Sequence, residues 1–355
     1  MKRIVYPSLF NYPKRNMQLV TKYIPLFFFI STFFIVSPSQ AQKLKGKNIE
    51  AALHEAYNKY KDVEEGKNAD YIKELANVPS DLFGIVIVTV EGKVYSIGDV
   101  TDEVSIQSVS KAFIMAKVID EIGADSIAHA VGVEPTGEVF NSITAIERSK
   151  GKKINPLVNP GAIATTSLMA GRDSVQKWYN IRNTLNSFAG RDLDIDWNVY
   201  NSEANDNKRN QAISMLLLSY GRMYFDPLQS TDIYTKQCAV SVNAKDLAVM
   251  GSTLANGGTN PLSHEVVILP DATQHALSVM ATSGLYDDAG KWLFYTGIPA
   301  KSGVGGGIVA VVPGKFGIAA IAPPLDEAGN SVKAKLAIHY IIEKLGVNPY
   351  LVEPK

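Results

Sequence analysis

The spacing of hydrophobic residues predicts two β-hairpins, one near each end of the chain, with mostly helices between them. An apolar run at residues 83–90 is followed by the turn pair Glu91-Gly92 and by the alternating stretch 93–98, a pattern typical of a hairpin. Residues 306–313 and 315–323 repeat this pattern around Pro313-Gly314. Apolar residues that recur every three to four positions predict helices at 47–61, 69–77, 161–171, 210–223, 243–256, 271–283 and 330–345.

This order of elements predicts a mixed α/β fold of the α+β type. Strands at both ends of the chain would form one antiparallel sheet, flanked by helices and interrupted by a helical insertion. We expect a signal peptide over residues 1–41 and a single unit over 42–355. Its mixed sheet and helix part would span roughly 42–125 and 285–355, and its helical part roughly 126–284.

The N-terminal segment has the pattern of a secretory signal peptide. Basic residues precede the 13-residue apolar run 24–36, and Ser39-Gln40-Ala41 offers small residues at a cleavage site. We expect cleavage after Ala41 and export, with a periplasmic location. An uncleaved anchor is the alternative, although a membrane span needs about 20 apolar residues. Met17 is an alternative start of translation.

Charge and composition exclude several classes of protein. Residues 42–355 hold 30 Lys and Arg against 35 Asp and Glu, so this part lacks the basic surface that nucleic-acid binding requires. The only cysteine, Cys238, leaves no internal disulfide. Five histidines are scattered without ligand spacing, so we expect no metal site and no cofactor.

The segment after the first hairpin holds the best candidate for catalytic chemistry. Ser108 and Lys111 are three residues apart at the start of a predicted helix, so their side chains would share one face. A desolvated lysine amine can take the serine proton, and the helix N-terminus can stabilise an oxyanion. The same S-x-x-K spacing occurs at Ser149/Lys152 and Ser174/Lys177, so the motif alone is weak.

A second motif strengthens the first. Lys301-Ser302-Gly303 stands directly before the late hairpin. In penicillin-recognising serine enzymes, S-x-x-K is followed distantly by a K-[ST]-G triplet on an edge strand that flanks the substrate. The two motifs in this order predict an exported hydrolase in which Ser108 is the nucleophile and Lys111 the base.

The chain resembles the serine-dependent glutaminases, which share the β-lactamase-like fold of β-lactamases and DD-peptidases. The resemblance spans nearly all of residues 47–347 and rests on the following segments: Ala69-Asp-Tyr71-Ile, Gln107-Ser-Val-Ser-Lys111, Asn155-Pro-Leu-Val-Asn159, Ser202-Glu203, Arg209-Asn210, Tyr234 ahead of Cys238, Leu254-Ala-Asn-Gly-Gly258, Ser283-Gly-Leu-Tyr286-Asp and Pro299-Ala-Lys-Ser-Gly-Val304. It implies an amidohydrolase that converts L-glutamine to L-glutamate and ammonia, without metal or cofactor, and a homo-oligomer (dimer or tetramer).

The resemblance also implies a role for each site residue. Ser108 would form the acyl-enzyme, Lys111 would be its base, and Tyr234 and Tyr286 would relay protons. The backbone N–H groups of Ser108 and Val304 would form the oxyanion hole. The residues that would hold the substrate are Tyr71, Gln107, Ser108, Asn159, Glu203, Asn210, Tyr234, Tyr286 and Val304. A carboxylate at Glu203 suits the ammonium of a free amino acid, and amides suit its carboxylate.

Two positions depart from the family pattern. Pro160 stands where alanine is common, and we expect proline to push Asn159 away from helical geometry. Asn207 stands where glycine is common, in a turn that we expect to need left-handed backbone. Three other functions stay open: an exported β-lactamase or D-Ala-D-Ala peptidase, an amino-acid binding protein without catalysis, and an asparagine-preferring amidase.

Overall fold

The computed structural model describes residues 45–352, and its centre is one five-stranded antiparallel sheet. The strand order is β2 (Val94–Gly98), β1 (Gly84–Thr89), β7 (Phe316–Ile321), β6 (Gly307–Val312) and β5 (Ala300–Ser302). Both predicted hairpins are present, and β1 pairs with β7 from the other end of the chain. The expected closure of one sheet by both chain ends is therefore confirmed.

Fourteen α-helices surround the sheet or form the helical part within the described residues. Their bounds are α1 (Gly46–Tyr60), α2 (Lys73–Ala76), α3 (Ser110–Ile122), α4 (Ala124–Ala130), α5 (Ile143–Arg148), α6 (Asn159–Leu168), α7 (Ser174–Ala189), α8 (Trp197–Asn205), α9 (Lys208–Ser219), α10 (Pro227–Cys238), α11 (Ala244–Ala255), α12 (Pro270–Ser283), α13 (Ala289–Thr296) and α14 (Val332–Leu345). None of them combines the length and apolarity that crossing a bilayer requires.

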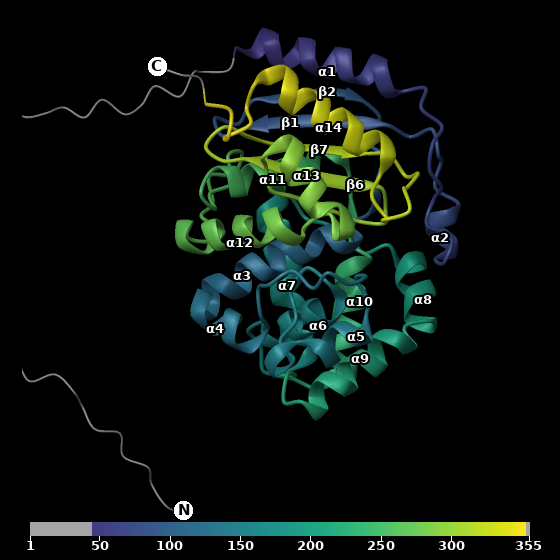
Figure 1. Ribbon diagram of the computed structural model, residues 1–355, viewed down its shortest axis with the longest axis vertical. Helices are drawn as coiled ribbons and strands as arrows, with labels where there is room; N and C mark the ends of the chain where they lie inside the picture. Colours follow the sequence, from purple (N-terminus) through teal and green to yellow (C-terminus); the bar gives the residue numbers. More distant parts are fainter. Residues whose placement is uncertain (1–44, 353–355) are drawn as a thin grey trace, which may run out of the picture. The chain divides into compact units, whose positions relative to one another are not determined.

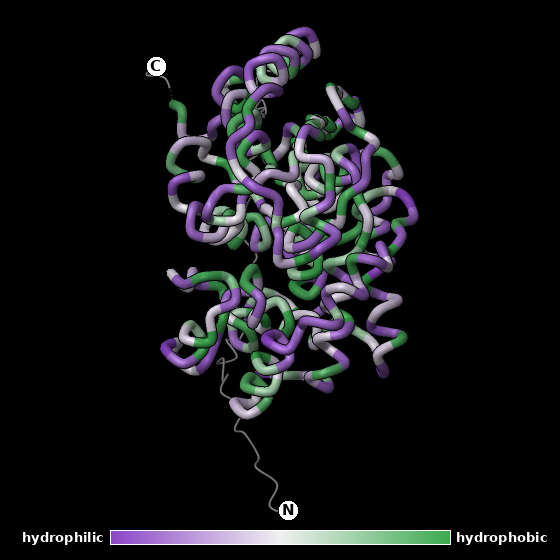
Figure 2. The backbone as a smooth tube through the Cα atoms, turned by 90° about the vertical axis from the view of Figure 1, so that its right-hand side faces the viewer, coloured by the Kyte–Doolittle hydropathy of each residue, from purple (hydrophilic) through white to green (hydrophobic). Residues whose placement is uncertain are grey.

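The sheet is buried on both faces because helices from distant parts of the chain cover it (Figure 1). The helices α1 and α14 lie side by side on one face, and α11 packs on the other against β1, β6 and β7. Every residue of β1, β6 and β7 is buried, whereas β2 at the edge alternates between exposed and half-buried positions. This burial explains why the central strands are continuous apolar runs. Figure 2 shows hydrophobic segments of the backbone, in green, in the interior of the molecule.

The sequence pattern misplaced several elements. Only Lys73–Ala76 of the expected helix at 69–77 is helical. Helix α11 belongs to the span predicted as a helical insertion, yet it packs directly on the sheet. The two-stranded sheet of β3 (Val104–Ser105) and β4 (Ser241–Val242) was not predicted, and hydrophobic spacing did not show β5, although the Lys301-Ser302-Gly303 motif implied an edge strand there. These strands have only two or three residues each, too few to show a period. The expected signal peptide lies outside the described residues.

Candidate active site

Ser108 and Lys111 form a buried pair at the junction of two helical segments. A 3-10 helix, η1 (Gln107–Val109), continues directly into α3, so the two side chains meet on one face. The Nζ of Lys111 lies 2.5 Å from the Oγ of Ser108, and both residues are buried. Burial lowers the pKa of Lys111 to about 8, because a desolvated ammonium is unfavourable. Its neutral amine is thus accessible near neutral pH.

The glycine-rich loop 303–306, between β5 and β6, packs closely against the segment that carries Ser108. A Cβ on Gly305 would lie 2.3 Å from the carbonyl oxygen of Ser105, and one on Gly303 would lie 2.9 Å from that of Ile106. Only glycine allows this close approach. Within residues 45–352, the backbone N–H groups of Ser108 and Val304 have no hydrogen-bond acceptor, so both are available to an oxyanion.

Asn159 is the centre of a hydrogen-bond network beside this pair. Its Oδ1 accepts from Lys111 at 3.0 Å and from the Tyr234 hydroxyl at 3.1 Å. Its Nδ2 donates to Oδ1 of Asn210 at 3.2 Å. Since the oxygen of Asn159 receives two donors, the orientation of its amide is determined. Among the described residues, one side-chain N–H of Asn159 and both of Asn210 have no acceptor, so they are available to an anion.

Glu203 is a carboxylate without a cationic partner. The Nε2 of Gln107 donates to it at 2.5 Å, and no lysine, arginine or histidine of residues 45–352 forms an ion pair with it. Burial raises the pKa of Glu203 to about 7, although the hydrogen bond from Gln107 and the charge of Lys111 oppose this. A partly buried carboxylate without a cation is unfavourable, so this arrangement favours a ligand that brings an ammonium group.

Tyr286 approaches the site from the other side, on the segment after α12. Its φ of 51° is in the left-handed region, which a residue with a bulky side chain rarely adopts. The hydroxyl donates to the carbonyl oxygen of Ser302 at 3.3 Å, and the ring lies 5.4 Å from that of Phe140. Burial raises the pKa of Tyr286 to about 12, opposed by its interactions with Ser108 and Ser302. Tyr286 is therefore a neutral O–H donor.

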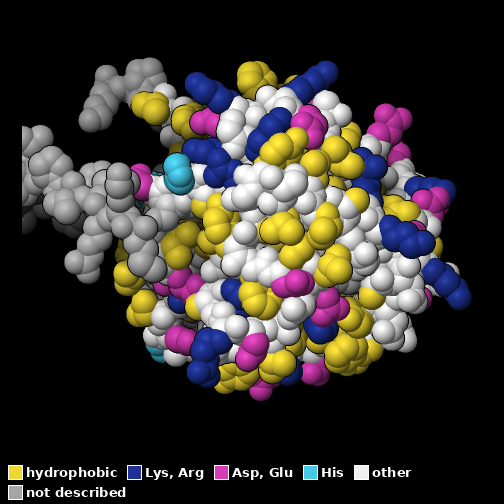
Figure 3. Space-filling view, turned by 90° about the horizontal axis from the view of Figure 1, so that it is seen from below, with side chains coloured by type: hydrophobic (Ala, Val, Ile, Leu, Met, Phe, Trp, Pro, Cys, Tyr) yellow, Lys and Arg dark blue, Asp and Glu magenta, His cyan; other side chains and the backbone are white. Residues whose placement is uncertain are grey.

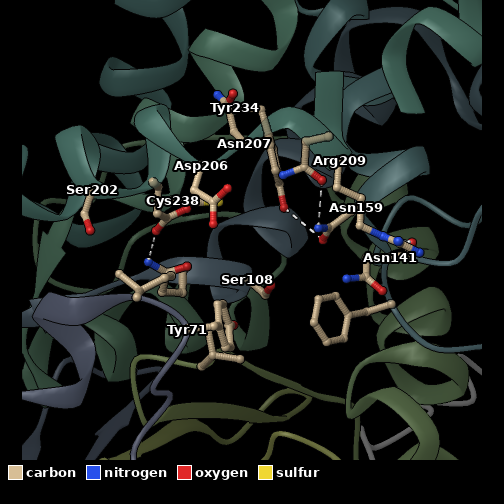
Figure 4. Close-up of a pocket in the computed structure, with 16 residues that line it drawn as sticks. Tyr71, Ser108, Asn141, Asn159, Ser202, Asp206, Asn207, Arg209, Tyr234 and Cys238 are labelled. Atoms are coloured by element: carbon tan, nitrogen blue, oxygen red, sulfur yellow. Dashed lines mark hydrogen bonds between the residues drawn. The ribbon is translucent and has the colours of Figure 1, made fainter. Parts of the chain in front are cut away.

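These residues meet at one cavity of about 280 Å³, near the lower end of the roughly 300–1,000 Å³ range of small-molecule sites. In Figure 4, Tyr71 and Asn159 lie on either side of Ser108, and Tyr234 lies above Asn159. The predicted residues that line the cavity are Tyr71, Gln107, Ser108, Asn159, Glu203, Asn210, Tyr234 and Val304. Lys111 and Tyr286 do not line the cavity, but both interact with Ser108.

The cavity includes residues to which the sequence analysis assigned no role in the site, notably Phe140, Asn141, Ser202, Asp206 and Arg209. Ser202 and Arg209 are adjacent in sequence to the predicted site residues Glu203 and Asn210, so the sequence could have indicated them. Phe140 and Asn141 belong to a loop without a motif, so nothing in the sequence indicated that they line the cavity. The backbone N–H of Asn159 donates to the Phe140 carbonyl at 2.7 Å, which holds this loop against the site.

Both expectations about the departures from the family pattern were wrong. Asn159 is the first residue of α6, so Pro160 occupies the second helical position. A proline there is tolerated because the N–H it lacks would have no partner in the first turn. Asn207 precedes α9 with a φ of −91°, so the turn does not need left-handed backbone.

Comparison with known proteins identifies the family. A family model described as Glutaminase matches residues 66–350. The glutaminase of Colwellia psychrerythraea is 48% identical over 300 residues, which cover 84% of this chain and 96% of the relative. Glutaminase 2 of Yersinia pestis is 45% identical over 326 residues, with coverages of 92% and 94%.

Solved structures agree with the sequence relatives. A structure described as the probable glutaminase ybaS is 42% identical with a TM-score of 0.85, and the match covers 86% of this chain and 99% of that one. A structure of Mglu in its glutamate form is 35% identical with a TM-score of 0.81 and coverages of 86% and 71%. This chain therefore belongs to the glutaminase family of amidohydrolases.

Proposed function

We propose that this chain hydrolyses the side-chain amide of L-glutamine through a γ-glutamyl ester on Ser108. The observation that carries the proposal is the buried Ser108–Lys111 pair at 2.5 Å, placed in one cavity with the unpaired carboxylate of Glu203. The first offers an activated nucleophile, and the second offers a site for the ammonium of a free amino acid.

Acylation begins when neutral Lys111 takes the proton of Ser108. The serine oxygen then bonds to the amide carbon, and the oxyanion is stabilised by the backbone N–H groups of Ser108 and Val304. The carbon–nitrogen bond breaks as the nitrogen receives a proton from Lys111 through a tyrosine hydroxyl, which releases ammonia. Tyr286 is suited to this relay because its hydroxyl is neutral and lies beside Ser108.

Deacylation repeats the same proton transfers with water as the nucleophile. Neutral Lys111 accepts one proton from the water, relayed through the Tyr286 hydroxyl, as the water attacks the ester carbon. The carbon–oxygen bond to Ser108 then breaks, and Lys111 returns this proton to the serine oxygen. The products are L-glutamate and the free enzyme. The free N–H groups of Asn159 and Asn210, with the Tyr71 hydroxyl, are placed to hold the substrate's α-carboxylate.

The test is ammonia release from L-glutamine by the purified chain and by its Ser108→Ala variant. We expect release by the first and none by the second. Equal release by both would remove Ser108 from its role. Release from neither, with both proteins folded, would favour the alternatives. Penicillin labelling would then support a β-lactamase or D-Ala-D-Ala peptidase, and tight glutamine binding would support a non-catalytic binding protein.

Three finer points remain proposals. We propose export to the periplasm after cleavage at Ala41, supported by the residue pattern of 1–41.

We propose a homo-oligomer, supported by large exposed apolar side chains such as Phe294, and light scattering of the purified chain would give its mass. Asparagine is shorter by one methylene, a difference worth about 1–3 kcal/mol, so we expect slower turnover of asparagine than of glutamine.

A further inference from the structure

Lys301 is a buried lysine that the proposed mechanism does not use. It lies in the edge strand β5 with an exposed fraction of 0%, and it does not line the cavity. Its Nζ donates to two backbone carbonyl oxygens, those of Gly284 at 2.9 Å and Ser302 at 2.6 Å. No carboxylate of residues 45–352 pairs with it. A buried, unpaired amine is unfavourable, so its position needs a reason.

Lys301 contacts Tyr286, a residue of the proposed mechanism. The Nζ of Lys301 lies 4.3 Å from the centroid of the Tyr286 ring, so the amine packs against the face of this ring. The Tyr286 hydroxyl donates to the same Ser302 carbonyl at 3.3 Å. Lys301 thus makes the short bond to this oxygen and leaves the long one to Tyr286. A hydroxyl held by a long bond can turn toward another acceptor at little cost.

Lys301 also fixes the start of the segment that carries Tyr286. Gly284 is the C-cap of α12, and its carbonyl accepts from both Lys301 Nζ and the backbone N–H of Ser302. A Cβ on Gly284 would lie 1.7 Å from the carbonyl oxygen of Ala300, so this close approach requires glycine. Two residues later the chain enters the left-handed conformation of Tyr286.

We propose that Lys301 is a positioning residue for Tyr286. It holds the ring by its face and occupies the Ser302 carbonyl, which leaves the Tyr286 hydroxyl able to turn between Ser302 and Ser108 during proton transfer. This inference rests on the proposed function, in which Tyr286 moves the proton of Ser108. It differs from the sequence expectation, in which the Lys301-Ser302-Gly303 triplet flanks the substrate.

The chain contains a matched control in Lys177. Its Nζ also donates to two carbonyl oxygens at a helix C-terminus, those of Ser167 in the last turn of α6 and of Met169 directly after it, and it lies 4.9 Å from the centroid of the Phe225 ring. Asn159 is at the opposite end of that helix. Lys177 therefore has the same kind of bonding as Lys301 but contacts no residue of the site, so its replacement reports the loss of such bonding at the far end of α6.

The test is a double-mutant cycle on the kcat for L-glutamine, with Lys301→Met, Tyr286→Phe and the double variant. We expect Lys301→Met to lower kcat by about 10-fold or more and to change KM by less than about 3-fold, since the interaction acts on the reaction step. In the Tyr286→Phe background, the same change should lower kcat by less than about 3-fold. Lys177→Met should lower Tm without lowering kcat.

If Lys301→Met lowers kcat equally in the parent and in the Tyr286→Phe variant, the role proposed for Lys301 is wrong. The role proposed for Tyr286 is not affected by that result. An unchanged kcat in Tyr286→Phe would instead overturn the role of Tyr286 in the proposed function. If Lys301→Met does not fold, the same cycle is run with Lys301→Gln, which keeps a donor for the carbonyls. If neither folds while Lys177→Met does, Lys301 is a folding residue and the proposal is wrong.

Discussion

At the scale of the residue, burial together with a hydrogen bond to the motif serine distinguishes one S-x-x-K motif from the other two, since Lys177 is buried as well but does not bond to Ser174. Lys111 is 2% exposed and bonds to Ser108. Lys152 is partly exposed and bonds to Glu147, and Lys177 bonds to backbone carbonyls. Only a desolvated amine with a lowered pKa can accept a proton near neutral pH. Spacing alone does not provide this property.

Replacing Lys111 with methionine should remove the base while keeping the buried volume. We expect kcat/KM for L-glutamine to fall by about 100-fold or more, as for loss of a general base. Lys152→Met is the matched control, because it changes an S-x-x-K lysine away from the cavity, and its kcat/KM should stay near that of the parent. Comparable losses in the two variants would contradict the role of Lys111.

The pH dependence of activity should follow Glu203 and Lys111. Burial raises the pKa of Glu203 to about 7 and lowers that of Lys111 to about 8. The active form needs a deprotonated carboxylate and a neutral amine, so both groups must lose a proton as the pH rises. We expect kcat/KM, which reports the free enzyme, to increase between about pH 6 and about pH 8.5. A profile that is flat or falls over this interval would be inconsistent with these roles.

At the scale of the element, close backbone contacts decide where helices and loops lie. Helix α11 reaches the sheet because β7 has a glycine at the contact. A Cβ on Gly317 would lie 2.1 Å from the backbone nitrogen of Ser252. Gly303 and Gly305, which precede β6, likewise allow their loop to approach the backbone of residues 105 and 106 closely. Such contacts cannot be relieved by rotating a side chain, since the clash is with backbone.

Gly317→Ala should therefore separate α11 from the sheet. We expect the free energy of unfolding to fall by about 1–3 kcal/mol, the usual range for overpacking, or by more. Gly290 in α13 is the control, because a Cβ there meets nothing within 4 Å. Gly290→Ala should raise helix stability by about 0.5–1 kcal/mol. Urea unfolding of the two variants gives both values, and similar midpoints would contradict the packing argument.

At the scale of the whole molecule, the described residues place the site between two structurally different parts. Ser108, Lys111 and the network of Asn159 belong to helices, whereas Val304 lies in the loop after the edge strand β5, and the hydroxyl of Tyr286 bonds to the β5 residue Ser302. Figure 3 shows a face on which basic and acidic side chains are interspersed around apolar ones. This face carries no broad basic field of the kind that binds nucleic acid.

The proposed export gives a prediction about the intact chain. Expressed in a Gram-negative host, the protein should be recovered from the periplasm with Gln42 as its first residue. N-terminal sequencing of the purified protein measures this directly. Recovery from the membrane fraction with residues 1–41 retained would support the uncleaved anchor instead.

The sequence by itself determined the elements whose residues are long, periodic or chemically distinctive. The central strands are apolar because helices cover both faces of the sheet, and the long amphipathic helices follow from one buried side each. The motif around Ser108 and its distant partner before β6 also specified the reaction class, because such chemistry needs particular residue types. The site residues beyond these two motifs came from the resemblance to the family.

Only the tertiary structure decided how these residues meet. The hydrogen bonds of Asn159 join residues up to 75 positions apart in the chain, and no local pattern encodes them. The lowered pKa of Lys111 and the raised pKa of Glu203 come from burial, which depends on the packing of distant elements. The short strand β5 and the contact between Lys301 and Tyr286 are set in the same way, because an edge strand of three residues is defined by its neighbours in space.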